Sequence, residues 1–307
     1  MSMAVIRTVN GDLSPDSFDL FHCHEHIWID GSFLGPESPV RPIDDFEKSL
    51  SELKLLKKGT LLVDCQPLNV GGDFGCFRRL SAESGIGIVA STGFHKLCFY
   101  RDDSRVLKAR EYDLRRSFFR QAGRCGIIKT AVEKEGITGR YEVLHTAAAR
   151  TASETGLKVI VHTDPGSDAL GLLDFYARLG VEESCVILCH LDRTEPDIGI
   201  HIEAARRGAF LEYDTIARPK YHTDEDEIGI IGRVCGAGYE KNVLLGLDTT
   251  RERLRSYCEN TAVGLDYLEN NFIKKLRGHG FDEKTVELMI RDNPRKAISF
   301  VPKEIKK

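Results

Sequence analysis

The feature that most constrains the fold of this chain is a series of eight short apolar runs that recur along its whole length. Most of them are continuously apolar, which is typical of parallel strands buried on both faces and not of half-exposed antiparallel strands. The runs are Phe18–Ile27, Thr60–Pro67, Gly87–Phe94, Cys125–Val132, Lys158–Pro165, Ser184–Asp192, Gly208–Thr215 and Asn242–Thr249.

Amphipathic stretches of helical periodicity separate these runs. In residues 44–58, apolar side chains recur at Phe46, Leu50, Leu53 and Leu56, as on the buried face of a helix. Three further stretches follow the same plan, at residues 141–155, 168–179 and 196–207. Alternating strands and helices predict an α/β fold of the (β/α)8 TIM barrel type, with residues 1–307 in a single domain.

A doubly wound open sheet is the competing topology for this pattern. That fold carries a glycine-rich phosphate-binding turn after an early strand, whereas Gly71, Gly72 and Gly75 lack the required spacing and indicate a flexible loop. At the other end of the chain, residues 259–300 predict helix, turn, helix. We expect Asn293-Pro294 to start the last helix, which would close the bottom or side of the barrel.

Composition narrows the class of protein. A net charge of −4 and a pI near 6.2 argue against general nucleic-acid binding. No apolar run reaches the roughly 18–20 residues of a membrane span, and the N-terminal stretch lacks the features of a signal peptide. The nine cysteines are odd in number and form no C-x-x-C pair, which is typical of a reducing compartment. We therefore expect a cytoplasmic protein.

Three histidines occupy alternate positions at the end of the first run: His22, His24 and His26. Side chains alternate with period 2 along a strand, so we expect all three on one face, close to the carboxyl end of the strand. Two imidazoles at this spacing can bind one divalent metal ion such as Zn, Ni, Co or Fe.

Further candidate ligands follow other runs. Lys129, His162, His190 and Asp248 each lie near the end of a predicted strand, and such ends share one site in a barrel. Taken alone, each residue also has an ordinary structural explanation. The histidines could be core residues bonded to the backbone, Asp248 could cap a helix, and Lys129 could reach the surface. Together they form an imidazole and carboxylate set with the chemistry of a metal site.

Lys129 ends the apolar run Gly126-Ile127-Ile128, so its amine is expected to be buried. A buried amine tends to lose its proton. A neutral amine can add carbon dioxide, and the resulting carbamate can bridge two cations.

At these residues the sequence resembles the phosphotriesterase-related branch of the amidohydrolase superfamily. The resemblance is carried by His24-Glu25-His26, by Lys129 in GIIKTA, by His162 in VIVHTD, by His190 in ILCHLD and by Asp248 in LLGLDTTR, with Asn293-Pro294-Arg295-Lys296-Ala297 matching the terminal pattern. It implies an amidohydrolase-type barrel with two divalent metal ions, most simply Zn, with Mn, Co or Ni as alternatives.

By this analogy, His24, His26 and Asp248 hold the buried ion, and His162 and His190 hold the exposed one. Carbamylated Lys129 bridges both. Cys23 stands where the family usually has a small residue such as Thr, and His22 has no counterpart in the family pattern.

Two ions that share a water lower its pKa and supply hydroxide, so the resemblance implies a metal-dependent hydrolase. Asp248 is the expected catalytic residue, taking the proton of the hydroxide and passing it to the leaving oxygen. The family includes lactonases, phosphotriesterases and carboxylesterases.

Basic and aromatic residues in the loops favour an anionic substrate. Loops after strands 7 and 8 are the usual phosphate site of these barrels, and Arg and Lys bind phosphate by charge-assisted bonds. Similarity to the phosphofuranose lactonases indicates Lys220, Tyr221, Arg251, Arg255 and Tyr257 as phosphate-binding residues. Lys96 and Tyr100, after the third run, are expected to make other substrate contacts.

Three functions stay open. The first is hydrolysis of a phosphorylated sugar lactone, a 1,4-lactone 5-phosphate. The second is an acyl-homoserine lactonase, phosphotriesterase or carboxylesterase with the same binuclear centre, which would need an apolar rim. The third is a non-catalytic barrel that binds a phosphorylated ligand. The expected partner is a small anionic molecule, a phosphorylated sugar lactone on the first reading. No nucleic-acid or membrane partner is expected, and a homodimer is common in this branch.

Overall fold

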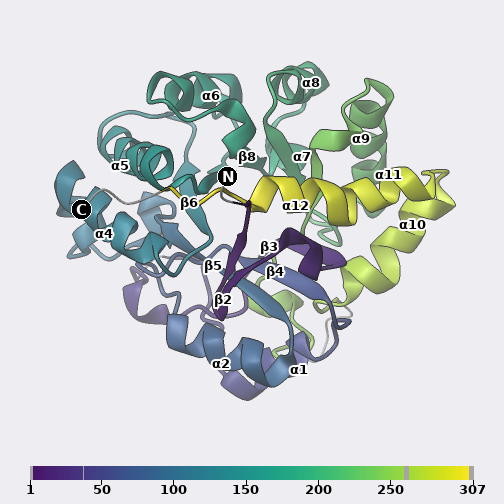
Figure 1. Cartoon of the computed structure of the whole chain (residues 1–307), viewed down its shortest axis with the longest axis horizontal. Helices are drawn as coiled ribbons and strands as arrows, with labels where there is room; N and C mark the ends of the chain where they lie inside the picture. Colours follow the sequence, from purple (N-terminus) through teal and green to yellow (C-terminus); the bar gives the residue numbers. More distant parts are fainter. Residues whose placement is uncertain (1–2, 37, 259–262, 304–307) are drawn as a thin grey trace.

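In the computed structural model, residues 3–36, 38–258 and 263–303 are described. Within them, eight parallel strands form one sheet in the order of the sequence, and the sheet curls into a nearly closed barrel (Figure 1). The strands are β3 (Leu20–Glu25), β4 (Thr60–Asp64), β5 (Gly87–Gly93), β6 (Ile127–Val132), β7 (Lys158–Thr163), β8 (Val186–Cys189), β9 (Phe210–Tyr213) and β10 (Val243–Leu245). Each lies inside one of the eight apolar runs, so the predicted (β/α)8 barrel is confirmed.

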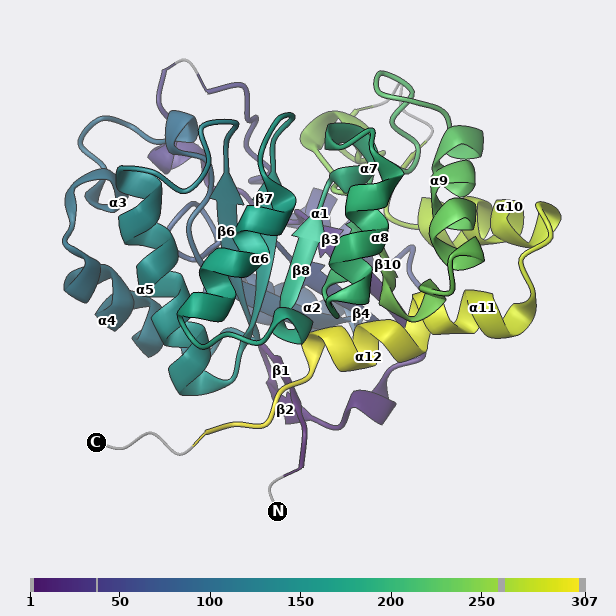
Figure 2. The same cartoon turned by 90° about the horizontal axis from the view of Figure 1, so that it is seen from above.

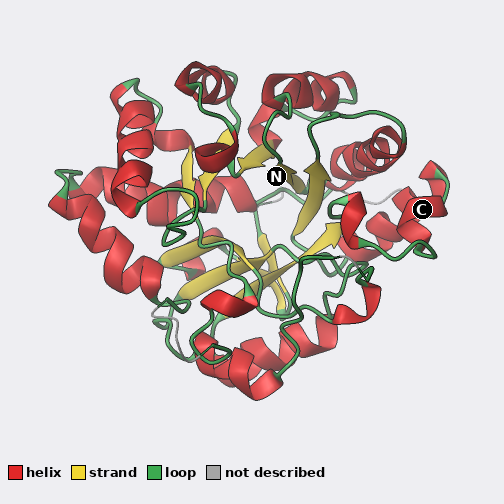
Figure 3. Cartoon of the chain, turned by 180° about the vertical axis from the view of Figure 1, so that it is seen from behind, coloured by secondary structure: helices red, strands yellow, loops and turns green. Residues whose placement is uncertain are grey.

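Helices surround the strands (Figure 3). They are α1 (Phe46–Leu53), α2 (Phe74–Ser84), α3 (Arg105–Lys108), α4 (Glu111–Ala122), α5 (Arg140–Thr155), α6 (Ala169–Arg178), α7 (Leu191–Thr194), α8 (Ile198–Arg206), α9 (Asp224–Gly236), α10 (Ile273–Gly278), α11 (Glu283–Glu287) and α12 (Asn293–Ile298). Short 3-10 turns are η1 (Pro15–Ser17), η2 (Gly31–Phe33), η3 (Leu97–Phe99), η4 (Glu183–Cys185), η5 (Glu240–Asn242) and η6 (Arg251–Arg253).

Local chemistry sets where several helices begin and end. The side chain of Asp45 accepts from the backbone of Lys48 at the start of α1, and Asp168 caps α6 in the same way. α5 ends at Gly156, whose φ of +83° suits glycine in a left-handed C-cap. None of the helices in the described ranges is both long and apolar enough to cross a membrane.

The lower end of the barrel is filled by apolar side chains. A hairpin of β1 (Ile6–Thr8) and β2 (Gly11–Leu13) lies at this end together with α12 (Figure 2). Ile6 and Ile298 pack in one buried cluster with side chains inside the barrel, such as Phe21, Leu61 and Ile127. The lower half of the barrel is therefore a packed core, and polar side chains gather towards the carboxyl ends of the strands.

A β-bulge in β3 overturns the expectation that the three histidines share one face. The pairing of β3 with β4 shifts register between His22 and Glu25, so strict alternation fails there. Cys23 packs in the interior cluster, and His24 also faces the interior, next to Glu212 and Lys129. His22 instead bonds to Glu25, with its Nδ1 3.0 Å from Oε1.

Between β3 and β10 the described residues form no strand ladder; the seam is closed by side chains and by one backbone bond, from the nitrogen of Asp248 to the carbonyl of His24 at 2.9 Å. The buried carboxylate of Glu25 accepts from the backbone nitrogen of Leu247 at 3.0 Å and from the Thr249 hydroxyl at 2.8 Å. Gly246 allows the strands to approach, because a Cβ there would lie 2.9 Å from the Cβ of His24. This seam brings the first and last strands of the barrel together, with the polar residues that follow them.

The C-terminal region differs in one respect from the expected helix, turn, helix. Asn293-Pro294 starts the last helix, α12, as expected, but no turn precedes it, because α11 passes directly into α12 through the π-helical segment η8 (Leu288–Asp292). The backbone nitrogen of Asn293 bonds to the carbonyl of Leu288, five residues back, which accommodates the proline that follows. A similar π segment, η7 (Leu268–Phe272), precedes α10. Residues 259–262 of the predicted region lie outside the described residues.

Candidate active site

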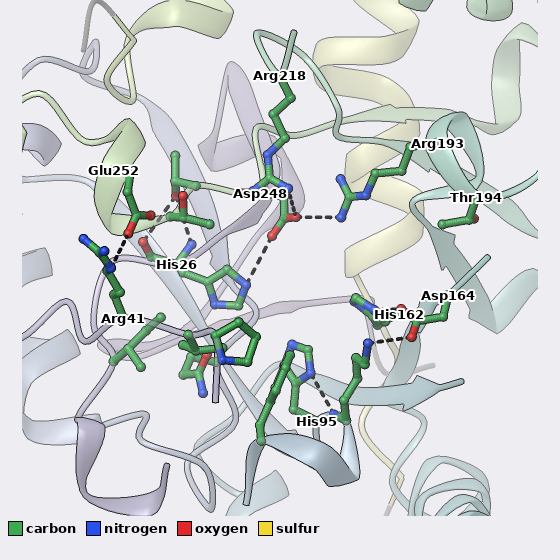
Figure 4. A pocket seen from close by; sticks show the side chains of 18 of the residues that line it. His26, Arg41, His95, His162, Asp164, Arg193, Thr194, Arg218, Asp248 and Glu252 are labelled. Atoms are coloured by element: carbon green, nitrogen blue, oxygen red, sulfur yellow. Dashed lines mark hydrogen bonds and ion pairs between the residues drawn. The ribbon is translucent and has the colours of Figure 1, made fainter. Parts of the chain in front are cut away.

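Four of the six predicted metal ligands form a buried cluster at the carboxyl ends of the strands. His24 Nε2 lies 3.1 Å from Lys129 Nζ and 3.7 Å from Asp248 Oδ1. His26 Nε2 lies 3.4 Å from the same carboxylate oxygen (Figure 4). These residues come from β3, from β6 and from the turn after β10, so the barrel joins positions more than a hundred residues apart.

His162 and His190 complete the set from β7 and from the end of β8. Their ring centroids lie 4.3 Å apart, and the His190 ring lies 5.0 Å from that of His24. His190 Nδ1 is 2.7 Å from Asp214, and His162 Nε2 is 2.9 Å from Asp164. The six predicted residues therefore occupy one region.

The donor set fits divalent metal ions of the Zn type. One potential ligand atom from each of His24, His26 and Asp248 lies within 4.8 Å of the others. His26 Nδ1 is buried and has no hydrogen-bond partner among the described residues. The Nδ1 atom of His24 faces the carboxylate of Glu212 at 2.9 Å, an outer bond that commonly fixes the tautomer of a ligating histidine and leaves Nε2 as the donor.

Carboxylates behind the histidines were not found from the sequence. Glu212 is fully buried on β9, and Asp214 follows two residues later, 3.2 Å from His24 Nδ1 and 2.7 Å from His190 Nδ1. The sequence did hold one signal for them: in Leu211-Glu212-Tyr213-Asp214 the two acidic residues are two positions apart, which places both on one face of a strand. Such outer carboxylates orient imidazoles and raise their basicity towards a metal.

The environment of Lys129 differs from the expectation that burial by itself would leave its amine neutral. Burial lowers the pKa of Lys129, but the acidic groups of Cys65, Cys189 and Glu212 raise it by more, so its pKa lies above the ordinary value. The amine is fully buried as predicted. Carbamylation of Lys129 stays a prediction.

Two arginines that the sequence did not single out bind Asp248. Arg193 Nη2 and Arg218 Nη1 lie 2.8 and 2.9 Å from Asp248 Oδ2 (Figure 4). Burial opposes ionisation of this carboxyl group, but Arg218, the bond from His26 and Arg193 hold the pKa of Asp248 well below its ordinary value. Asp248 is therefore ionised at neutral pH.

Backbone strain is concentrated at the same place. Among the described residues, the non-glycine residues with positive φ are His190 (69°), Ala217 (56°) and Asp248 (45°). His190 and Asp248 are predicted ligands, and Ala217 precedes Arg218. Such conformations cost about 1–3 kcal/mol each and persist where the surroundings hold them, often at functional sites.

A cavity of about 340 Å³ opens above this cluster. Its lining includes both polar and aromatic side chains: His26, His95, Lys96, Phe99, His162, Arg193, Arg218, Lys220, Tyr221, Asp248 and Thr250. Most of the cations in the lining are paired: Lys96 lies 2.5 Å from Asp164, and Arg41 lies 3.2 Å from Glu252. A small polar molecule can therefore reach the predicted ligands through a basic rim.

Lys220 and Tyr221 are the predicted phosphate-binding residues that line the cavity. Lys220 Nζ lies 4.7 Å from the centroid of the Tyr221 ring, and the Arg193 guanidinium lies 5.1 Å from the same centroid. No ion pair to a carboxylate is found for Lys220 within the described parts of the chain. Its charge is thus available to a ligand.

The other predicted phosphate contacts are turned away from the cavity. Arg251 donates to the carbonyl of Pro42 at 2.6 Å, and Arg255 binds Asp266 at 2.7 Å. The Tyr257 hydroxyl donates to the carbonyl of Asp45 at 2.7 Å. These three residues follow β10, and neighbouring groups take up their polar atoms outside the cavity lining.

Of the two residues predicted to make other substrate contacts, only Lys96 lines the cavity. The Tyr100 hydroxyl is buried and accepts from the backbone nitrogen of His95 at 2.9 Å. Tyr100 therefore supports the loop that carries His95 and is not itself part of the lining.

Comparisons with known proteins place this geometry among metal-dependent hydrolases. The family model described as "Phosphotriesterase family" matches residues 4–298. A phospho-furanose lactonase of Mycoplasmopsis agalactiae is 28% identical over 328 residues, which cover 96% of this chain and 91% of that protein. An N-acetyltaurine hydrolase of Salmo salar is 24% identical over 345 residues, with coverage of 96% and 98%. The crystal structure of a lactonase from Listeria monocytogenes has a TM-score of 0.88 at 24% identity and covers 96% of this chain and 99% of its own.

Proposed function

Because the chain belongs to the phosphotriesterase family and is a hydrolase like its relatives, we propose that it opens a phosphorylated sugar lactone, such as a 1,4-lactone 5-phosphate. The observation that carries this proposal is Lys220, a cation at the rim of the cavity whose charge is not taken up by a carboxylate of the described chain. The name of the phospho-furanose lactonase relative supports the same substrate class.

We assign the metal ligands as the sequence predicted. His24, His26 and Asp248 would hold one divalent ion, and His162 and His190 a second, with carbamylated Lys129 between them. Zn is the simplest choice for imidazole and carboxylate donors. When bound, such ions lower the pKa of a shared water and polarise a carbonyl oxygen.

The residues of the chain have separate tasks in this proposal. The carboxylate of Asp248 accepts the proton of the attacking water and returns it to the leaving ring oxygen. Arg193 and Arg218 orient that carboxylate, since both guanidinium groups bind its Oδ2 atom. Lys220 and Tyr221 hold the phosphate at the rim, so that the lactone carbonyl points down to the cluster.

The alternatives are less well supported by the cavity. An acyl-homoserine lactonase or a phosphotriesterase needs an apolar rim for an acyl chain or for ester groups. The lining does include the apolar residues Ile29, Phe33, Pro39, Val40 and Phe99, but the cation Lys220, which pairs with no carboxylate of the described chain, lies among them and favours an anionic group. A non-catalytic binding protein would not need Lys129 and Asp248 together in the cluster. N-Acetyltaurine is a second candidate substrate, because relatives carry that name and its sulfonate would meet the same cation.

The test compares paired 1,4-lactones with and without a 5-phosphate, measured by proton release, together with N-acetyltaurine, measured by release of the primary amine, using Zn-reconstituted protein. We expect turnover of the phosphorylated lactones, its loss on chelation, and its return when Zn is added back. Lys220→Gln removes one charge-assisted bond of about 1.5–3 kcal/mol, so kcat/KM for the phosphorylated lactone should fall about 10- to 150-fold.

Arg255→Gln is the matched control, because its charge is bound to Asp266 outside the cavity. It should leave kcat/KM unchanged. Equal turnover of phosphorylated and unphosphorylated lactones, or an equal effect of the two variants, would contradict the role of Lys220. Turnover of N-acetyltaurine alone would support the proposed anion-binding site but would contradict a lactone as the substrate.

A further inference from the structure

We propose that Asp192, His222 and Glu227 form an additional divalent-cation site, separate from the strand-end cluster. One potential ligand atom from each residue lies within 4.8 Å of the others. Asp192 lies in α7, His222 in the loop between β9 and α9, and Glu227 in the first turns of α9. Such an ion would tie three elements together behind the active-site loop.

The three side chains are already held in place. His222 Nε2 lies 3.1 Å from Glu227 Oε2. Asp192 Oδ2 accepts from the backbone nitrogens of Asp214 and Thr215, at 2.9 and 2.7 Å. A preorganised set of this kind binds an ion without much loss of side-chain entropy.

The charge of this group is not balanced by nearby cations. Glu227 is fully buried, and among the described residues its carboxylate oxygens have no hydrogen-bond partner apart from the approach of His222 Nε2 to Oε2. Arg193 is the neighbouring cation, but its guanidinium binds Asp214 and Asp248. Two buried carboxylates without full compensation are costly, and a divalent ion would neutralise both.

A shared proton is the competing explanation. Burial and then the carboxylates of Asp192 and Asp214 raise the pKa of Glu227 well above its ordinary value, so without a cation Glu227 retains its proton. Cation binding would replace that proton. The two explanations therefore differ in whether metal is bound, which can be measured directly.

The donor chemistry points to a Zn-type ion. Imidazole nitrogen and carboxylate oxygen are both Zn ligands, and a water would complete four-coordination. Access is also available, because a surface hollow includes His222 in its lining, together with Glu225 and Asp226. The acidic side chains at its edge favour the approach of a cation.

The consequence concerns the loop between β9 and α9. This loop carries Arg218, Lys220 and Tyr221 into the active-site cavity, and His222 is its next residue. An ion on His222 and Glu227 would fix the end of that loop. The additional site would thus hold substrate-binding residues without touching the substrate.

The test is the Zn²⁺ content per chain. A chelator first removes the metal from three proteins: wild type, His222→Ala and Glu227→Gln. Each is then dialysed against Zn²⁺, and its Zn²⁺ content is measured by inductively coupled plasma mass spectrometry. We expect each variant to bind one Zn²⁺ fewer than wild type. His24→Ala/His26→Ala, which disrupts the strand-end cluster, should still lose one further equivalent when His222→Ala is added.

His279→Ala is the matched control, since it removes an exposed imidazole that bonds only to the carbonyl of Lys275 among the contacts found. It should keep the wild-type stoichiometry. Equal Zn²⁺ content in wild type, His222→Ala and Glu227→Gln would overturn the proposal and favour the shared proton. Because His222 lies in a loop and its side chain is 14% exposed, whereas Glu227 is fully buried, His222→Ala decides the outcome even if Glu227→Gln does not fold.

Discussion

Replacement of Glu25 should show how much of the stability of the barrel depends on its seam. Glu25 is fully buried between β3 and the turn after β10, where the described strands form no ladder. Its Oε1 accepts from the nitrogen of Leu247, and its Oε2 accepts from the nitrogen and hydroxyl of Thr249. The variants Glu25→Ala and Glu25→Gln remove different parts of this arrangement.

The expected costs follow from the groups left without partners. In Glu25→Ala, the N–H groups of Leu247 and Thr249 and the Nδ1 atom of His22 lose their partner, at about 1–3 kcal/mol each, and a cavity adds to this. The Thr249 hydroxyl can turn to the carbonyl of His26 at 3.2 Å. We therefore expect Glu25→Ala to lower the free energy of unfolding by about 3–6 kcal/mol.

Glu25→Gln keeps the volume and one carbonyl oxygen. With that oxygen facing Leu247, the amide can donate to the Thr249 hydroxyl, so only the Thr249 N–H bond of 3.3 Å is lost. The expected cost is about 1–2 kcal/mol. The order of the two variants is thus part of the prediction.

Urea unfolding measures these costs, followed by circular dichroism and by the fluorescence of Trp28, which is the single tryptophan of the sequence and lies close to the seam. Glu287→Gln is the control, because it removes an exposed pair with Arg291 and should change stability by no more than about 0.5 kcal/mol. A Glu25→Ala cost below about 1 kcal/mol, or equal costs for both Glu25 variants, would refute the seam argument.

Two further predictions concern catalysis and pH. Asp248→Asn should lower kcat/KM about 10²- to 10⁴-fold, because the amide cannot accept the proton. The control is Asp197→Asn, at the cap of α8, which should leave kcat/KM unchanged. Similar kinetics for the two variants would contradict the role of Asp248 as the proton acceptor. Burial lowers the pKa of His145 from 6.5 to about 4, although its bond to the carbonyl of Ala131 opposes this. Between these pH values the unfolded state binds the proton that the folded state excludes, so stability should fall by about 3 kcal/mol from pH 6.5 to 4, and His145→Gln should remove this part of the slope in urea midpoints. An unchanged slope would show that His145 is not the titrating group.

Some features of the site could be predicted because they depend on local periodicity. Continuous apolar runs mark strands buried on both faces, and eight of them in alternation with helices specify a barrel. A barrel then brings the ends of its strands together. His24, His162, His190 and Asp248 could therefore be predicted to share one site, although they are far apart in the sequence.

Other features depend on contacts that no local pattern encodes. A bulge in β3 turns His22 away from its expected face, and period 2 holds only where the strand is regular. The pKa of Lys129 depends on Cys65, Cys189 and Glu212, which come from three other strands. Burial could be predicted for this amine, but the acidic groups around it could not.

The sequence by itself determined the barrel and which residues would meet at the strand ends, because strand periodicity and strand-end convergence are properties of the chain pattern. Only the tertiary structure decided which loop residues line the cavity. Loops have no periodicity, so Lys220 and Arg251 look alike in the sequence. Arg251 binds the carbonyl of Pro42 and the carboxylate of Asp44, and Lys220 lines the cavity, where its charge can meet a ligand.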